Sequence, residues 1–124
     1  MHAVDHYKCY RVKVTPGTPL AAVDRKVTVQ DQFTPEKLYT LRRVRHLCLP
    51  VNKNGEGIKN PDVHMLCYRG HRARGEIHFI PRRGVFTNNQ FGDLRIDAIR
   101  ENEFCIPSRK SLSPSGAFLD EACE

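Results

Sequence analysis

The sequence predicts an all-β domain in which two repeats of about four strands each, related by a pseudo-twofold axis, merge into one barrel or sandwich braced by disulfides. Three observations support this prediction. The chain repeats its own motifs, its apolar residues alternate as in strands with almost no helical period, and four of its five cysteines recur at equivalent places. A length of 124 residues suits one domain, whereas a unit of under about 60 residues seldom folds alone. We therefore expect the repeats to share one core.

Three short motifs carry the repeat and return in the same order along the chain. They occupy residues 6–11 and 64–69, 32–33 and 90–91, and 47–50 and 104–107. The offsets between the copies are 58, 58 and 57 residues. We therefore predict a single domain over residues 5–110, made of repeats 5–53 and 63–110, followed by a Ser/Pro/Gly-rich tail at 111–124.

The first repeat contains three extended stretches. Residues 6–14 and 26–30 alternate between two faces, and residues 38–49 continue as a long strand. The segment 15–19, which contains two prolines and a glycine, separates the first two stretches. These patterns predict the first half of the sheet structure.

The second repeat follows the same plan. Its strands are predicted at residues 65–69, 76–80, 94–99 and 104–106. Within 76–80, Ile77 and Phe79 share a face. Residues 82–84 are interpreted as a breaker and residues 88–92 as a turn.

The central turn differs between the repeats. Thr34 follows Phe33 in the first copy, whereas Gly92 follows Phe91 in the second. The first turn is therefore predicted to form differently, with help from Pro35.

Cysteine positions predict disulfides but leave their connectivity open. Cys9 corresponds to Cys67, and Cys48 corresponds to Cys105. The simplest pairing closes one loop in each repeat, and the exchanged pairing, Cys9 to Cys105 and Cys48 to Cys67, also preserves the symmetry. Closing a loop of this size contributes about 3 to 4 kcal/mol in the chain-entropy model. Disulfides would place the protein in an oxidising compartment.

Two other uses of the cysteines compete with this prediction, namely buried free thiols and zinc binding. A histidine stands three residues before both Cys9 and Cys67, but side chains three apart on a strand point to opposite faces. We therefore expect no metal and no cofactor. Cys123 has no counterpart, which makes it a candidate for an intermolecular bond, with an inert terminal thiol as the alternative.

The net charge of +6 points to a second kind of site. The candidate polyanion-binding residues are Arg42, Arg43, Arg45, Arg69, Arg72, Arg74, Arg82 and Arg83. Such side chains can bind phosphate or sulfate groups of nucleic acids or acidic glycans. The alternative is that they cover solvent-facing surfaces and protect sheet edges from aggregation.

Catalytic motifs are not evident in the sequence. It contains no Gly-rich phosphate loop, no His-Glu-x-x-His helix and no Gly-x-Ser-x-Gly elbow. Only His6 and His64 recur between the repeats, and a structural hydrogen-bonding role is the simpler explanation for them. We predict that the protein is not an enzyme.

Several motifs occur in a fixed order: Cys-Tyr-Lys/Arg at a strand start, Asp-Gln-Phe or Asn-Gln-Phe-Gly in a central turn, and Leu-Cys-Leu-Pro-x-x-Lys at the end of a unit. Over about residues 6–110 this pattern resembles an uncharacterised repeated domain of predicted secreted and cell-surface proteins of environmental bacteria. The resemblance implies export, disulfide pairing and use as a module, and it lends no catalytic residue.

Together these features predict a non-catalytic extracellular or cell-surface module for binding or assembly, with a protein or another copy of itself as partner. Self-assembly could proceed by docking of the tail 111–124 onto the sheet of a neighbour. Residues 1–5 show no signal segment, and no apolar run approaches the roughly 20 residues that would cross a bilayer. Polyanion binding is the alternative function, and an enzyme of unknown class is the third.

Overall fold

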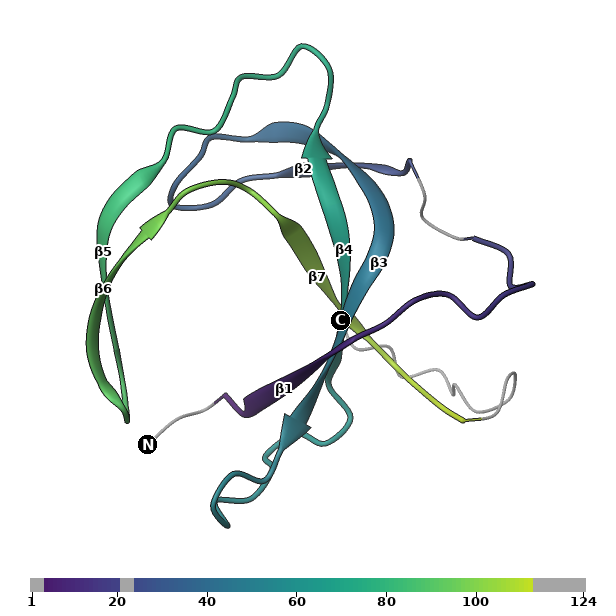
Figure 1. Ribbon diagram of the computed structural model, residues 1–124, viewed down its shortest axis with the longest axis vertical. Helices are drawn as coiled ribbons and strands as arrows, with labels where there is room; N and C mark the ends of the chain where they lie inside the picture. Colours follow the sequence, from purple (N-terminus) through teal and green to yellow (C-terminus); the bar gives the residue numbers. More distant parts are fainter. Residues whose placement is uncertain (1–3, 21–23, 113–124) are drawn as a thin grey trace. The chain divides into compact units, whose positions relative to one another are not determined.

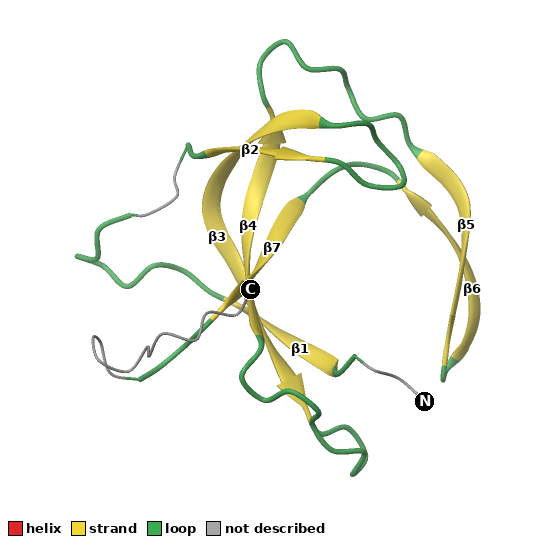
Figure 2. Cartoon of the chain, turned by 180° about the vertical axis from the view of Figure 1, so that it is seen from behind, coloured by secondary structure: helices red, strands yellow, loops and turns green. Residues whose placement is uncertain are grey.

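The computed structural model describes residues 4–20 and 24–112 of the chain (Figure 1). These ranges contain strands and no helix (Figure 2), which confirms the all-β class. The strands are β1 (His6–Arg11), β2 (Lys26–Val29), β3 (Lys37–Val51), β4 (His64–Arg72), β5 (Arg82–Asn89), β6 (Gly92–Ala98) and β7 (Glu103–Ser108).

Five strands form one sheet in the order β1-β3-β4-β7, with β2 also paired to β3. The long strand β3 pairs antiparallel with β2 through its first half and with β1 through its second half. Strands β5 and β6 form a separate antiparallel hairpin. Among the described residues no pairing joins β1 to β7, so closure into a barrel is not observed there.

The chain divides into two compact units, and each of them draws on both predicted repeats. Of the described residues, the first unit holds those up to 20 together with 43–68 and 104–112. The second unit holds residues 24–42 and 69–103. The boundaries of the units therefore do not coincide with the boundaries of the repeats.

Six predicted strands are confirmed, with ends that differ from the prediction by up to three residues. The stretch predicted at 6–14 ends at Arg11, where β1 ends. The alternation of side chains was a sufficient signal in these segments because each of them pairs in an antiparallel sheet.

The strand predicted at 76–80 is wrong. That segment is irregular, and the strand of this region is β5, which includes the predicted breaker at 82–84. The ladder between β5 and β6 shifts its register between Arg82 and Val85. Gly84 lies in this irregularity with a φ of 73°, and its N–H donates to a carboxylate oxygen of Asp97 at 2.8 Å. A bulge of this kind lets a strand accommodate the glycine.

The pairings β2–β3 and β5–β6 have corresponding registers. Val27 lies opposite Tyr39, and Val85 lies opposite Ile96. The next pairs along the ladders correspond as well: Thr28 with Leu38, and Phe86 with Arg95. Residues that the sequence aligns between the repeats thus occupy matching positions in these two hairpins.

The turns after β2 and β5 begin in the same way and then differ, as predicted from the missing glycine in the first copy. Asp31 accepts a hydrogen bond from the N–H of Phe33 at 2.8 Å, and Asn89 accepts one from the N–H of Phe91 at 2.8 Å. Side chains of Asp and Asn favour such turns. The copies differ afterwards, because β6 starts directly at Gly92, whereas β3 starts only at Lys37.

The buried apolar side chains belong mainly to β3 and β4. In the second unit they are Tyr39, Leu41 and Ala73, and in the first unit they are Cys48 and Cys67. A core this small leaves much of the stabilisation to covalent and polar contacts.

Candidate functional site

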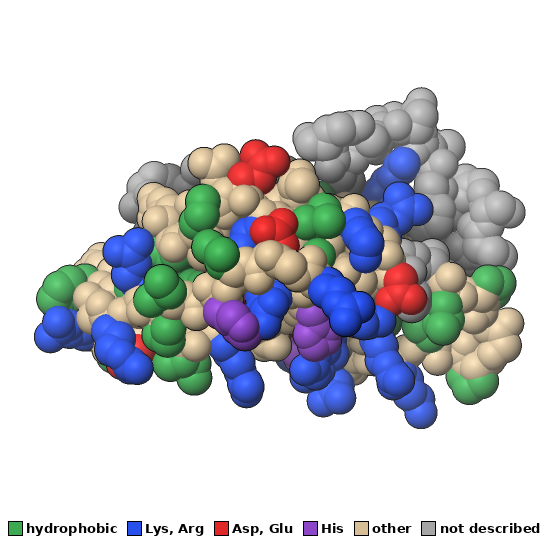
Figure 3. Space-filling view, turned by 90° about the horizontal axis from the view of Figure 1, so that it is seen from above, with side chains coloured by type: hydrophobic (Ala, Val, Ile, Leu, Met, Phe, Trp, Pro, Cys, Tyr) green, Lys and Arg blue, Asp and Glu red, His purple; other side chains and the backbone are tan. Residues whose placement is uncertain are grey.

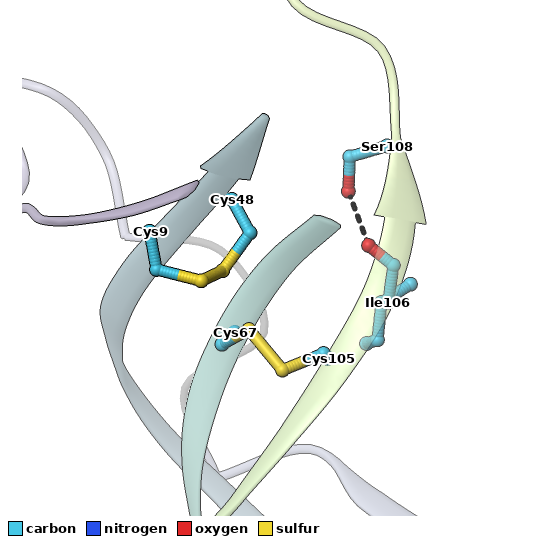
Figure 4. Close-up of a disulfide and its surroundings, with 6 residues drawn as sticks. All are labelled: Cys9, Cys48, Cys67, Cys105, Ile106 and Ser108. Carbon is cyan, nitrogen blue, oxygen red and sulfur yellow. Dashed lines mark hydrogen bonds between the residues drawn. A yellow bond between two sulfur atoms is a disulfide. The ribbon is translucent and has the colours of Figure 1, made fainter. Parts of the chain in front are cut away.

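Two disulfides cross neighbouring strands in the first unit (Figure 4). One joins Cys9 of β1 to Cys48 of β3, which are direct partners in the strand register. The other joins Cys67 of β4 to Cys105 of β7. The simplest predicted pairing is therefore confirmed, and the exchanged pairing is wrong. Cys123 lies outside the described residues.

A group of potential metal ligands surrounds the second disulfide. One ligand atom each from Cys67, Glu103 and Cys105 lies within 4.8 Å of the others. The two sulfur atoms are bonded to each other, and metals bind the thiolate rather than the disulfide. This group is therefore no metal site while the bond is intact.

The backbone groups on the outer edge of β1 can be assigned from one hydrogen bond. The N–H of Val12 donates to the carbonyl of Arg45 at 3.0 Å and continues the register of β1 with β3. Backbone groups alternate in direction along an antiparallel strand. The N–H and C=O of Tyr7, Cys9 and Arg11 therefore point away from β3.

The outer edge of β7 follows from a similar contact. The N–H of Gly70 donates to the carbonyl of Asn102 at 3.1 Å, and this contact fits the antiparallel register that places Cys67 opposite Cys105. The backbone groups of Glu103 and Cys105 therefore point away from β4. Among the described residues, β1 pairs only with β3 and β7 only with β4. The sheet thus ends in two outer strands, each fastened to its inner neighbour by a disulfide.

The two recurring histidines have different surroundings. The Nε2 atom of His6 lies 3.1 Å from a carboxylate oxygen of Glu56. The Nδ1 atom of His64 is buried and has no hydrogen-bond partner among the residues that the structure describes. Burial lowers the pKa of His64, and the charge of Lys110 lowers it further, against the opposing effect of Asp62. These surroundings favour the neutral form of the His64 imidazole.

This environment makes the stability of the protein depend on pH. Because the pKa of His64 is lower in the folded state than in the unfolded state, protons bind the unfolded chain more strongly. We expect the contribution of His64 to the free energy of unfolding to be constant above about pH 6.5 and to fall as the pH drops below that value. The free energy of unfolding of His64→Gln, measured by chemical unfolding, should depend less on pH than that of the wild type. His6→Gln, at the equivalent position, is the control, and an equal slope in the wild type and His64→Gln would contradict the prediction.

One group of the predicted arginines gathers in the second unit. Burial, followed by the charges of Arg69 and Arg42, lowers the pKa of His71, so both arginines act on this imidazole. Arg42 forms an ion pair with Asp24, whereas Arg69 makes no ion pair with any described residue. The local positive charge is therefore partly neutralised.

The other predicted arginines serve local contacts or lie apart. Arg72 donates to the carbonyl of Glu76 at 3.1 Å, Arg82 lies 5.2 Å above the ring of Phe33, and Arg83 pairs with Asp97 at 3.3 Å. Arg43 and Arg45 project from the face of β3 opposite to that of Arg42, and Arg74 is exposed in the turn after β4. Lys and Arg side chains are intermingled with His and hydrophobic ones in the space-filling view (Figure 3). Arg42 and its neighbours Arg43 and Arg45 therefore lie on different faces of β3.

No protein-family model, no curated protein and no solved structure matches this chain. The inferences about function therefore rest on the residues themselves. Within the described ranges, no helix is both long and apolar enough to cross a membrane.

A buried polar cluster in the second unit was not predicted. The ammonium of Lys37, whose side chain is 1% exposed, donates to the carbonyl of Ile77 at 2.9 Å and lies 3.4 Å from a carboxylate oxygen of Glu101. Tyr39 donates its hydroxyl to the other oxygen of Glu101. Burial and the Glu101 carboxylate raise the pKa of Tyr39. These residues join β3 to the segment between β6 and β7, and their separation in sequence conceals the contact.

Proposed function

We propose that this chain is a non-catalytic module that acts at a cell surface or in the extracellular medium, by binding another protein or further copies of itself. The observation that carries the proposal is the pair of outer strands β1 and β7, which present outward backbone groups and are fastened to their neighbours by Cys9–Cys48 and Cys67–Cys105. An exposed strand edge is a template for pairing with another chain.

The disulfides also support export, because such bonds persist in oxidising compartments. The resemblance to a repeated domain of surface proteins is part of the same proposal. So is a pseudo-twofold relation between repeats 5–53 and 63–110, which the corresponding registers of β2–β3 and β5–β6 support. The tail 111–124, which could dock as a donor segment, lies mostly outside the described residues.

Polyanion binding is the second candidate function. It draws support from Arg69 and Arg42, whose positive charges both lower the pKa of His71. Under this hypothesis the protein binds phosphate or sulfate groups, and its affinity for them falls steeply as the salt concentration rises.

One experiment separates the two candidates. We expect sedimentation velocity of the intact, oxidised chain to show concentration-dependent assembly that is retained between about 50 mM and about 500 mM salt, because paired backbone groups are screened little. Heparin should change the sedimentation coefficient only under the polyanion hypothesis, and only at low salt. A monomer at all concentrations that binds heparin at about 50 mM salt would overturn the assembly function and support the alternative.

A further inference from the structure

Strand β6 is the most exposed of the described strands, because six of its seven residues are exposed. Its hairpin partner β5 lies along one edge (Figure 1), and among the described residues no strand pairs with the other edge. An uncovered strand edge is a template for pairing with another chain. A hairpin of two strands is marginally stable by itself, whereas three or more strands with an apolar face are stable. The β5–β6 hairpin would therefore be stabilised by an added strand.

The backbone groups of β6 that point away from β5 follow from the hairpin turn. Two residues separate Asn89 from Gly92, and the residues that flank such a turn exchange hydrogen bonds. Bonded pairs alternate along an antiparallel ladder, so Leu94 and Ile96 also bond β5. The extra residue of the bulge belongs to β5, which leaves the alternation of β6 intact. The residues whose N–H and C=O point outward are therefore Asp93, Arg95 and Asp97.

The first repeat shows the equivalent edge with its bonds made. The corresponding registers of the two hairpins make Leu38 of β3 the equivalent of Arg95. The outward carbonyl of Leu38 accepts a hydrogen bond from the N–H of Ala73 at 2.8 Å, and its N–H donates to a carboxylate oxygen of Glu76 at 2.7 Å. Strand β3 also has β4 as a neighbour in the sheet. Within the described chain, β6 has no neighbour of this kind.

The two faces of β6 differ in chemistry. Leu94 and Ile96 lie on one face and are 62% and 46% exposed, whereas Tyr39, the equivalent of Ile96 in the first repeat, is 2% exposed. The other face carries a row of alternating charges, formed by Asp93, Arg95 and Asp97. A strand that pairs with β6 must therefore extend an apolar face and match a row of negative, positive and negative charges.

A second copy of β6 meets both requirements. When the two strands run antiparallel with Ile96 opposite Ile96 of the second copy, Arg95 of each copy lies opposite Asp97 of the other. Leu94 then lies opposite Ala98. Opposite charges on facing residues favour pairing. A register with Arg95 at the centre would instead place like charges opposite each other along the whole charged face, which opposes pairing.

A third register, with Leu94 at the centre, also pairs Arg95 with an aspartate but suits the apolar face less well. It places Ile96 opposite Gly92 of the second copy. Gly92 has a φ of 120°, which is not an extended strand conformation, and it offers no side chain to Ile96. The register centred on Ile96 pairs two β-branched side chains instead, and β-branched residues pack well on a pleated sheet.

The charged side chains can make these contacts in addition to those within their own hairpin. The Asp97 carboxylate accepts from the N–H of Gly84 at 2.8 Å and lies 3.3 Å from Arg83. A carboxylate offers about four acceptor sites, and this side chain is 45% exposed. The guanidinium of Arg95 lies 5.2 Å from the ring centre of Phe86, and contact with a ring face does not consume its N–H donors.

We propose that this chain forms a symmetric dimer in which β6 pairs antiparallel with β6 of a second copy, centred on Ile96. The two hairpins then make one four-stranded sheet. The proposal rests on the proposed function in its self-assembly form, and it adds a surface distinct from the edges of β1 and β7. Because the same residues of both copies meet, the contact is isologous and closes at two subunits. Larger assemblies would need the edges of β1 and β7 as well.

Cysteine cross-linking tests the register in the full chain, with Cys123→Ser as the parent. Facing residues in a non-hydrogen-bonded antiparallel pair have Cα atoms about 4.5 Å apart, which a disulfide can span, as between Cys9 and Cys48. We expect mild oxidation to convert Ile96→Cys into a covalent dimer joined at position 96. Leu94→Cys is the matched control: this position is more exposed, but it faces position 98, so the variant should keep the mass of a single chain.

A second pair of variants tests the backbone edge without a cross-link. Arg95→Pro removes an outward N–H that each copy contributes to the contact, and proline is tolerated where the nitrogen faces away from the partner strand. We expect it to be monomeric by light scattering at concentrations where the parent is dimeric. Arg95→Gln keeps the N–H, so it should still dimerise, with a dissociation constant raised by about tenfold or less. Mass spectrometry without reduction checks that both internal disulfides have formed.

Three results would overturn the β6 contact: a parent that is monomeric at all concentrations, Ile96→Cys that cross-links no faster than Leu94→Cys, or Arg95→Pro that dimerises like the parent. The last two, in a parent that assembles, would leave the proposed assembly function standing through another surface. The first would remove self-assembly altogether and leave binding to a different protein. The cross-linked dimer is a gain of signal at one chosen position, which a misfolded variant would not reproduce.

Discussion

Replacing Cys67 and Cys105 together by alanine is expected to lower the free energy of unfolding by about 4 kcal/mol, the chain-entropy cost of reopening a loop of this size. The bond joins residues 38 apart in sequence. Single domains are typically stable by about 5 to 15 kcal/mol, and the buried apolar core of this protein is small. The variant should therefore be largely unfolded in moderate urea, as monitored by far-ultraviolet circular dichroism.

The pair Cys9 and Cys48 provides the matched control for this prediction. Its residues are separated by 39 positions, so Cys9→Ala with Cys48→Ala should cost within about 1 kcal/mol of the first double variant if loop closure dominates. Cys67 is 1% exposed and Cys48 is 6% exposed, so packing losses at the two sites are similar. A loss of stability near zero for either pair would show that the cross-link hardly restricts the unfolded chain. It would also weaken the case for an oxidising compartment.

Much of the fold could be predicted from the sequence because its signals are local or repeated. Side chains that alternate over a few residues define a strand, and this was enough for β2, β3 and β7. The presence of disulfides followed from cysteines that recur at equivalent positions, although the sequence left two pairings open. Both kinds of signal can be read without knowing which strands are neighbours.

The failure at 76–80 arose from the same local rule. Ile77 and Phe79 alternate with polar residues, yet the segment has no partner strand, and alternation alone does not supply one. Gly84, interpreted as a breaker, lies inside β5 at an irregularity where its N–H bonds Asp97. A bulge depends on the partner strand, which the local sequence does not reveal.

The candidate site was harder to predict than the fold. Arginines that are adjacent in sequence, such as Arg42 and Arg43, point to opposite faces of a strand and cannot form one patch. The outer edges of β1 and β7 became visible only from the strand order and the direction of backbone hydrogen bonds. The contact between Lys37 and Glu101 joins residues 64 apart, and no pattern in the sequence indicates it.

Replacing Glu101 by alanine is expected to destabilise the protein by about 3 kcal/mol, because it leaves a buried ammonium without its counter-charge. Lys37 would keep the carbonyl of Ile77 but lose the carboxylate 3.4 Å away, and the hydroxyl of Tyr39 would lose the same acceptor. Urea unfolding of the oxidised protein measures the change. An exposed pair gives the control: Arg83→Gln, which breaks the contact with Asp97, should cost less than about 1 kcal/mol.

A substitution of the partner, Lys37, tests whether the uncompensated charge causes the loss of stability in Glu101→Ala. Lys37→Met removes the buried charge and keeps an apolar side chain of similar length, so it should cost less than Glu101→Ala; the Glu101 side chain, 25% exposed, can still reach water. The double variant Lys37→Met with Glu101→Ala should then be more stable than Glu101→Ala alone, since no buried ammonium remains to be compensated. If the two costs simply added, the ion pair would contribute nothing, and the loss at Glu101 would belong to its hydrogen bond with Tyr39.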